Sequence, residues 1–416
     1  MAEFLVLGAG MVGIGAALAL QARGHAVTVL DRGAPGSETS HGNAGVIQSE
    51  AVEPYAFPRD PRVLARYALG RTNDLIWHPR DLPKQAPALW AYFRASGPAR
   101  HADIAASYAR LIRRATRDHA PLIDASGTGT LIRKSGLGEV LRTERAIEAA
   151  GHRAERLRDR YGVPSEILTG AAIRTSDPAL TGDVAGLLLW TDSWSTRDPG
   201  ALTRAYAELF ERRGGCILKG DAMSLSRAGT AWRVASEGGP VEAEQVVVAL
   251  GPWSPDLLMR FGLRVRMIWK RGYHAHHRTP IDLARPYLDG ANGVVMTSTT
   301  QGLRITTGAE LVRREGPWSD RQMTRGRRGL GDLLEIGDPV PGSTWTGHRP
   351  CLPDMLPLVG RSPNEPSMWF DFGHGHQGFT LGPTTGELLA DIVEGRDDAL
   401  TQALHPGARK DALSAS

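Results

Sequence analysis

The sequence predicts an α/β protein in which a domain built from βαβ units is interleaved with an α+β domain built on an antiparallel sheet. Three observations predict this fold class. A Gly-rich turn between two short apolar strands opens the chain, amphipathic helical periods occupy residues 55–165, and strand patterns bounded by turn residues occupy residues 264–310. A chain of 416 residues is too long for one simple core, so two domains are the natural division.

The composition is that of an ordinary globular protein, with 41% hydrophobic and 23% charged residues. The formal charge of +4 does not indicate a nucleic-acid partner, because the basic residues, of which only five are Lys, are spread along the whole chain. No apolar run approaches the ~20 residues that a membrane span needs. Two cysteines far apart, with no CxxC motif, favour a reducing cytoplasmic compartment.

The stretch LVLGAGMVGIGAALAL near the N-terminus predicts a βαβ unit. Residues 4–7 form a short buried strand, residues 12–23 a helix and residues 26–30 a second strand that ends at Asp31. A secretion signal would need a basic segment before the apolar run and a small-residue cleavage site after it. The first charge is Glu3 and the apolar run continues into QARGHAVTVLDR, so the sequence does not indicate secretion.

The glycines of this unit match those of a dinucleotide-binding turn. Gly8 allows the tight turn, Gly10 lets a pyrophosphate approach the backbone, and Gly13 lets helix and strand pack closely. The helix N-terminus offers free N–H groups to the phosphates. Asp31 would accept the hydroxyls of a ribose and would repel a 2′-phosphate, which argues against NADP. The motif by itself leaves NAD and FAD open.

The segment after Asp31, RGAPGSETSHGNAGVIQSE, would wrap a ligand with backbone amides and hydroxyls. Its ETSxxNAG pattern resembles the FAD-binding loop of the D-amino-acid dehydrogenase and glycine oxidase family, the D-amino-acid oxidase-like flavoproteins. The resemblance implies a loop that runs along the pyrophosphate up to the flavin ring. The positions expected to contact the cofactor here are Arg32, Ser40, Asn43, Ala44, Gly45 and Val46.

Residues 55–165 predict amphipathic, Arg-studded helices that face solvent, a basic membrane-facing helix being the alternative. After them, Asp198 caps a helix that begins at Pro199 and ends at Gly214. The segment QVVVALGPWSPDLL then predicts a buried strand followed by a Gly turn. It resembles the segment with which the same family closes its nucleotide-binding sheet, which implies that Gly251 approaches the cofactor.

The strands expected over residues 264–310 carry a cluster of histidines. Alternation puts Tyr273 and His277 on one face and His274 and His276 on the other. No metal site is expected, because adjacent strand residues point apart and no carboxylate or Cys lies at suitable spacing. The motif RGYH resembles the family's substrate-domain strand, in which the Tyr faces the substrate pocket.

The C-terminal segment contains GHRPCLPDMLPLVG and GHGHQGFTLGPTTGELL, which resemble the last two motifs of the same family in the same order. The resemblance implies that the nucleotide is FAD. We expect it to be noncovalent, because Cys351 does not occupy the position through which sarcosine-oxidase relatives attach flavin. Arg349, expected in a Pro-bounded turn, would bind a substrate α-carboxylate through its planar fork, the alternative being a pair with Asp354.

A final helix is expected from about Thr380. The amides of Gly378, Phe379 and Thr380 would lie at its N-terminus, which the resemblance points at the N1 and C2 carbonyl of the flavin. Gly375 lies in the same loop and is expected to contact the cofactor. His376 is expected either to touch substrate or to form hydrogen bonds within the loop.

The resemblance runs from Leu5 to about Val393 and implies an FAD-dependent amino-acid dehydrogenase or oxidase of EC class 1.4, most like bacterial D-amino-acid dehydrogenases. Arg349, helped by Tyr273, would hold the carboxylate while hydride passes from Cα to flavin N5, and the imino acid would hydrolyse to a 2-oxo acid and ammonia. Glycine, sarcosine, or a cyclic imino acid such as proline or hydroxyproline are alternative substrates. The other alternative is an electron-transfer subunit that needs a partner chain.

The expected FAD-binding domain is discontinuous and comprises residues 1–55, 196–262 and 341–406. The substrate-binding domain comprises residues 56–195 and 263–340, and residues 407–416 are expected to be a tail. The expected location is the cytoplasm, with peripheral contact to the inner membrane left open. The electron acceptor, oxygen or quinone, and the oligomeric state are also left open.

Overall fold

The opening βαβ unit forms as expected in the computed structural model, which describes residues 1–182 and 184–415. Strand β1 (Glu3–Leu7) pairs in parallel with β2 (Ala26–Asp31), and α1 (Met11–Ala22) connects them. The four inner residues of β1 are buried, which matches a strand covered on both faces. The predicted limits are confirmed to within one residue at each end.

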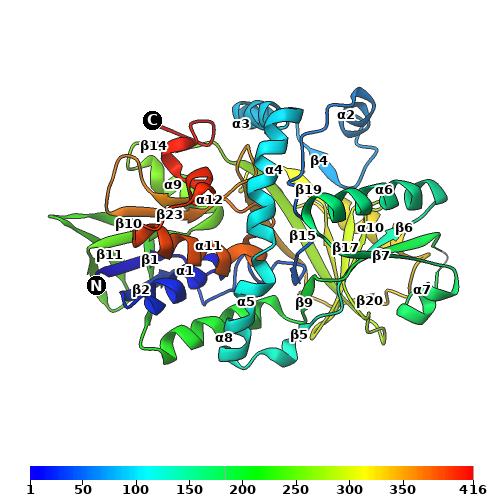
Figure 1. Ribbon diagram of the computed structural model, residues 1–416, viewed down its shortest axis with the longest axis horizontal. Helices are drawn as coiled ribbons and strands as arrows, with labels where there is room; N and C mark the ends of the chain where they lie inside the picture. Colours follow the sequence, from blue (N-terminus) through cyan, green and yellow to red (C-terminus); the bar gives the residue numbers. More distant parts are fainter. Residues whose placement is uncertain (183, 416) are drawn as a thin grey trace.

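This unit starts an eight-stranded sheet that is assembled from distant parts of the chain, on the left of Figure 1. Its order is β12-β11-β10-β2-β1-β13-β23-β22. The five central strands, from β10 to β23 in this order, are parallel to one another. The further strands are β10 (Cys216–Ala228), β11 (Ala231–Ser236), β12 (Gly239–Ala243), β13 (Gln245–Val248), β22 (Leu358–Arg361) and β23 (Met368–Phe372).

The helices α1, α8 (Pro199–Arg212) and α11 (Gly378–Val393) pack together at this sheet. Glycines allow α1 and α11 to touch backbone to backbone. A Cβ added to Gly15 would lie 2.5 Å from the carbonyl oxygen of Gly382, and one added to Gly386 would lie 2.5 Å from that of Gly15. Because no side chain separates them, the two helices are fixed relative to each other.

The second, eleven-stranded sheet lies on the right of Figure 1. Its central ladders are antiparallel, as predicted, while β16 with β6 and β19 with β4 are parallel. Its strands are β4 (Leu75–Trp77), β6 (Leu137–Leu141), β7 (Ser165–Thr169), β8 (Gly186–Trp190), β15 (Ile268–Arg278), β16 (Tyr287–Asp289), β17 (Val294–Thr299), β18 (Gly302–Thr307), β19 (Ala309–Leu311), β20 (Asp338–Pro339) and β21 (Trp345–Cys351).

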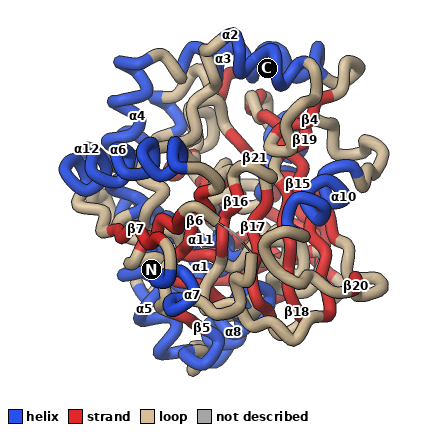
Figure 2. The backbone as a smooth tube through the Cα atoms, turned by 90° about the vertical axis from the view of Figure 1, so that its right-hand side faces the viewer, coloured by secondary structure: helices blue, strands red, loops and turns tan. Residues whose placement is uncertain are grey.

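Figure 2 looks onto this second sheet and shows β15, β17 and β18 side by side, with helices at its borders. Helices α6 (Glu144–Tyr161) and α7 (Ala171–Ser176) contact it at the β7 end, and α10 (Arg321–Leu330) contacts β15 and β18. The remaining elements are α2 (Pro61–Ala68), α3 (Leu82–Ala95), α4 (Pro98–Ile112), α5 (Ala115–Ser126), α9 (Ser254–Met259), α12 (Ala399–Leu404), β3 (Val46–Ile47), β5 (Ile132–Arg133), β9 (Trp194–Thr196), β14 (Leu263–Val265) and β24 (Leu413–Ala415). In the part of the chain that the structure describes, no helix is long and apolar enough to cross a membrane.

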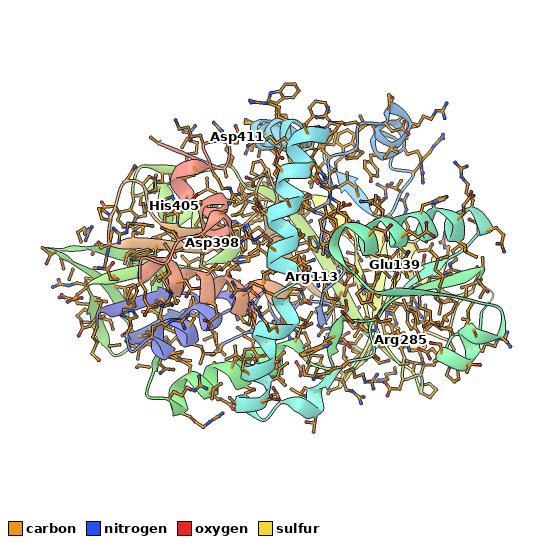
Figure 3. All side chains as sticks on the ribbon, in the orientation of Figure 1. Arg113, Glu139, Arg285, Asp398, His405 and Asp411 are labelled. Atoms are coloured by element: carbon orange, nitrogen blue, oxygen red, sulfur yellow. The ribbon has the colours of Figure 1, made fainter. Side chains whose placement is uncertain are left out.

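The helices predicted over residues 55–165 are present, but strands β4, β5 and β6 interrupt them. These strands are short and pair with partners far away in the sequence, so a local helical period does not reveal them. The arginines of α4 are paired rather than simply solvated. Arg110 lies 2.7 Å from Asp398 and Arg100 lies 3.5 Å from Asp411, and Figure 3 shows both acids in the C-terminal segment beside α4.

The proposed domain limits therefore separate segments that are packed together. α5 lies within the range 56–195 but packs on α8 and α11, and β21 lies within 341–406 but pairs with β15. Residues 407–416 do not behave as a separate tail in their described part, because β24 pairs with β14 and Arg409 is buried against Asp354. The limits remain a proposal.

Replacing Arg409 with Met is expected to lower the free energy of unfolding by ~3 kcal/mol, because it leaves the buried carboxylate of Asp354 without its cation. Urea denaturation measures this. The double variant Asp354→Leu/Arg409→Met, which removes both charges, should regain part of the loss. An Arg409→Met protein as stable as the parent would contradict a structural role for the C-terminal segment.

Candidate functional site

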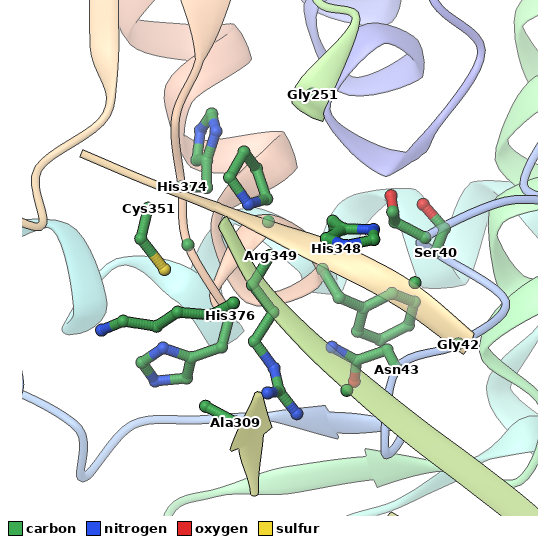
Figure 4. Close-up of a pocket in the computed structure, with 18 of the residues that line it drawn as sticks. Ser40, Gly42, Asn43, Gly251, Ala309, His348, Arg349, Cys351, His374 and His376 are labelled. Carbon is green, nitrogen blue, oxygen red and sulfur yellow. The ribbon is translucent and has the colours of Figure 1, made fainter. Parts of the chain in front are cut away.

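A cavity of about 970 Å³ lies between the two sheets and is lined by residues from both. Figure 4 shows its wall, with Ser40, Asn43 and Gly251 on one side and Arg349 and His376 on another. The predicted site residues that line it are Gly8, Gly10, Asp31, Arg32, Ser40, Asn43, Ala44, Val46, Gly251, Tyr273, Arg349, Gly375, His376, Gly378 and Phe379. Gly13, Gly45 and Thr380 lie behind this wall.

At the fingerprint end, backbone geometry explains why glycine is needed. Gly8 has φ +111°, and a Cβ there would lie 2.5 Å from the carbonyl oxygen of Ala249. A Cβ on Gly13 would lie 1.9 Å from the carbonyl oxygen of Gly8, so Gly13 serves close packing of helix on strand. Gly251 also has positive φ, and nothing lies within 4 Å of its added Cβ, which leaves open space beside the cavity.

Asp31 closes this end of the cavity. Its carboxylate accepts a hydrogen bond from the amide of Ala9 at 2.7 Å and one from the amide of Gly33 at 2.9 Å, which fixes its orientation. The neighbouring Arg32 guanidinium lies over the Trp253 ring at 4.4 Å from its centre. These residues fit an adenosine half of a dinucleotide, since a positioned acid faces the cavity beside a glycine turn and a helix N-terminus.

The loop that carries Ser40 and Asn43 is held from two sides. Ser40 Oγ accepts a hydrogen bond at 2.9 Å from the amide of Met11, at the start of α1. From the second sheet, Thr297 Oγ1 donates to the carbonyl oxygen of Ala44 at 2.9 Å. Gly42 admits the Trp345 ring, because a Cβ there would lie 1.9 Å from it. The loop therefore depends on the second sheet for its position.

Arg304 makes the strongest of these contacts, and sequence reasoning missed it. Its guanidinium is 2% exposed and donates to the carbonyl oxygens of His41 at 2.9 Å and Asn43 at 2.5 Å. Its Nε donates to Nε2 of His276 at 3.0 Å. Burial lowers the pKa of Arg304 to about 10, so it remains charged at neutral pH. The only signal in the sequence is an Arg inside the strand pattern GLRITT.

The histidines of β15 are buried and neutral. Burial and the nearby Arg304 cation lower the pKa of His274 to about 2 and that of His276 to about 4. Their rings lie 5.2 Å apart, which confirms the predicted shared face. Within residues 1–182 and 184–415, no group of three His, Cys, Asp or Glu side chains is placed to hold a metal ion.

Arg349 lies in strand β21, which corrects the expectation of a turn. Among the named strands of the described chain, β21 pairs with β15 alone, and such an edge position tolerates Pro350. Arg349 donates to the carbonyl oxygens of Gly308 at 2.7 Å and Thr307 at 2.9 Å. The alternative pair with Asp354 is wrong, since that carboxylate binds Arg409.

Arg349 forms no ion pair with an Asp or Glu of the described chain. The two carbonyl bonds fix the plane of its guanidinium, and its other N–H groups remain for a ligand. Gly272 on β15 provides room, because a Cβ there would lie 2.5 Å from Nη2 of Arg349. Such an arrangement is suited to a carboxylate that arrives with the ligand.

Tyr273 lines the same cavity, but its hydroxyl donates to Glu310 at 2.5 Å. Glu310 is also held by Arg271 at 2.8 Å and lies 2.7 Å from His78. Burial and the Glu310 carboxylate raise the pKa of Tyr273. Its only hydroxyl hydrogen is thus engaged, and it has none to donate to a substrate carboxylate in this arrangement.

His376 lines the cavity and is neutral, because burial and the Arg349 and Lys270 cations lower its pKa to about 3. Gln377 Nε2 donates to Nε2 of His376 at 3.0 Å and to Oε1 of Gln48 at 2.6 Å. The ring hydrogen therefore lies on Nδ1. His376 contributes a positioned neutral ring rather than a charged acid.

Helix α11 begins at Gly378, two residues before the expected position. The amide of Leu381 donates to the carbonyl oxygen of Gln377 at 2.8 Å, so the amides of Gly378, Phe379 and Thr380 precede the first intrahelical bond. Gly378 and Phe379 border the cavity, whereas the Thr380 hydroxyl donates to the carbonyl oxygen of Val46 at 3.2 Å. This N-terminus is placed to stabilise negative charge on a ligand.

Comparison with known proteins agrees with this geometry. The family model described as "DAO: FAD dependent oxidoreductase" matches residues 3–392. A "D-amino acid dehydrogenase" of Chromohalobacter salexigens is 30% identical over 413 residues, covering 96% of this chain and 97% of the relative. One of Cereibacter sphaeroides is 31% identical over 417 residues, covering 96% and 94%. The crystal structure of glycine oxidase from Geobacillus kaustophilus superposes with a TM-score of 0.70 at 22% identity, covering 96% of both chains, and shows the shared fold.

Replacing Arg304 with Met is expected to weaken FAD binding at least tenfold, because the carbonyl groups of His41 and Asn43 lose the donor that holds their loop. Titration of the apoprotein with FAD, followed by flavin fluorescence, measures the dissociation constant. Arg278→Met, at the exposed end of the neighbouring strand β15, is the matched control. Equal affinities in the two variants would refute the positioning role.

Proposed function

We propose that this chain, which belongs to the DAO family of FAD-dependent oxidoreductases, removes a hydride from Cα of a small D-amino acid. It is an FAD-dependent amino-acid oxidoreductase of EC class 1.4. The choice of the D enantiomer is supported by the names of the relatives at about 30% identity, and the structural neighbours named for glycine and L-proline oxidation share only the fold.

The observation that carries this proposal is the guanidinium of Arg349, which has no carboxylate partner among residues 1–182 and 184–415, in the cavity that the dinucleotide cradle also lines. An α-carboxylate on Arg349 would fix the substrate at two points and orient Cα toward the cofactor. The residues that we propose to hold FAD are Gly8, Gly10, Asp31, Arg32, Ser40, Asn43, Ala44, Val46, Gly251, Gly375, Gly378 and Phe379, supported by Gly13, Gly45 and Thr380 behind them.

FAD supplies the two-electron acceptor that no amino-acid side chain provides. The substrate reacts with a neutral amine, whose lone pair forms the C=N bond as Cα–H leaves with its electron pair. A proton is then lost from nitrogen, and water converts the imino acid to a 2-oxo acid and ammonia. The cation of Arg349 favours the neutral amine, because like charge lowers the pKa of the substrate ammonium.

No residue of the cavity is required as a base in this scheme. His376 is neutral, and its Nε2 already accepts a hydrogen bond from Gln377. It therefore orients the substrate and excludes water rather than removing a proton. We propose that the electron acceptor is oxygen or a quinone. Measuring how fast each of them reoxidises the reduced flavin would distinguish the two. A cytoplasmic location is supported by two free thiols, Cys216 and Cys351.

Anaerobic mixing of the FAD-loaded protein with paired D- and L-amino acids tests the reaction directly. Bleaching of the flavin by D-amino acids is the expected result. Bleaching by sarcosine or proline alone would favour the alternative substrates, and no bleaching by any amine would favour an electron-transfer subunit that needs a partner chain.

Replacing Arg349 with Leu should lower kcat/KM by about a thousandfold, chiefly through KM, while FAD remains bound, because the substrate carboxylate loses a bidentate cation. Steady-state kinetics together with the flavin absorption spectrum measures both properties. Arg349→Lys keeps the charge but not the planar fork, so its kcat/KM should lie between that of the parent protein and that of Arg349→Leu. Unchanged kinetics in Arg349→Leu would remove this residue from substrate binding.

A further inference from the structure

Lys270 is a second cation in the same cavity, and neither the sequence motifs nor the proposed chemistry accounts for it. It lies on β15 directly opposite Arg349 on β21, in an antiparallel ladder. Residues in such register share one face of the sheet, with Cβ atoms ~5 Å apart. Both side chains line the cavity. Figure 4 shows Arg349 and His376 pointing into the same region of this cavity.

In the part of the chain that the structure describes, neither of the two cations has an acidic partner. Lys270 Nζ lies 4.6 Å from the centre of the Tyr92 ring, and no Asp or Glu of the described chain forms an ion pair with it. Both cations act on His376, lowering its pKa, and on Cys351, whose thiol stays neutral because burial raises its pKa. The carboxylates of Glu310 and Asp354 are committed elsewhere, the first to Arg271 and the second to Arg409.

Two half-buried cations on adjacent strands repel each other, and a single α-carboxylate neutralises only one of them. A ligand with a second carboxylate would complete the charge balance. The cavity wall beside Lys270 also includes Tyr55, Phe57 and Tyr92, whose rings would contact the methylene groups between the two carboxylates. Charge and apolar surface thus match one class of amino acid.

We propose that the substrate is an amino dicarboxylate of aspartate or glutamate size, with its α-carboxylate on Arg349 and its side-chain carboxylate on Lys270. This inference rests on the proposed function and narrows it to acidic amino acids. The competing arrangement places both cations on the α-carboxylate. In that case Lys270 would affect all amino acids equally, and the test below separates the two.

The test compares isosteric substrates that differ only in side-chain charge. We expect kcat/KM for glutamate over glutamine, and for aspartate over asparagine, to exceed about tenfold in the parent protein, measured with both enantiomers. Lys270→Met should remove that preference while leaving the amide members within about threefold of the parent. Equal losses on acid and amide, or a parent protein without preference, would overturn the inference.

The matched control is Lys219→Met, an exposed lysine of β10 whose ammonium pairs with Glu237 at 2.5 Å, outside the cavity. It should retain the full preference. Flavin absorption and thermal unfolding of each variant establish that the fold and bound FAD are intact. A Lys270→Met protein that loses FAD would be replaced by Lys270→Gln, which keeps a polar side chain without charge.

A binding measurement that needs no turnover gives a second readout. Glutarate and succinate should perturb the flavin spectrum at concentrations at least about tenfold lower than butyrate, and Lys270→Met should abolish that difference. If neutral D-amino acids bleach the flavin but dicarboxylates bind no better than butyrate, only this inference fails. If no amino acid bleaches the flavin, the proposed function fails with it.

Discussion

The hydrogen bonds from Arg304 to the carbonyl oxygens of His41 and Asn43 join the two sheets at the cavity. The loop that bears these carbonyls begins at the first sheet, while Arg304 belongs to the second. A charged donor that is 2% exposed must find acceptors, and here loop carbonyls meet that need together with His276. The cofactor end and the substrate end of the cavity are therefore built on one continuous framework.

Buried cations set the electrostatics of this framework, because its histidines are neutral. His274 and His276 lie beside Arg304, and His376 lies beside Arg349 and Lys270, and each has a pKa lowered to about 4 or below. Asp371, which also lines the cavity, is fully buried, and burial raises the pKa of its carboxyl. The region around Arg349 consequently carries positive charge at neutral pH and attracts anionic ligands.

The sequence predicted what is local and missed what depends on register. The glycine turn, Asp31 and α1 follow from spacing within about thirty residues, and the motifs around Arg349 and Gly378 were found through resemblance. That Arg349 lies in a strand and faces Lys270 follows only from the pairing of β21 with β15. The role of Arg304 likewise depends on a distant partner, Asn43. The ordered structure of residues 407–415 depends on another, Asp354.

The backbone contact between α1 and α11 bears on how such a protein diversifies. At Gly15, Gly382 and Gly386 a single added carbon atom would collide with the facing helix, so this interior surface admits almost no inherited change. The rings of Tyr55 and Phe57 and the ammonium of Lys270 border the cavity instead. Divergence among descendants should accumulate at that border, which allows new metabolic roles to arise while nucleotide recognition is conserved.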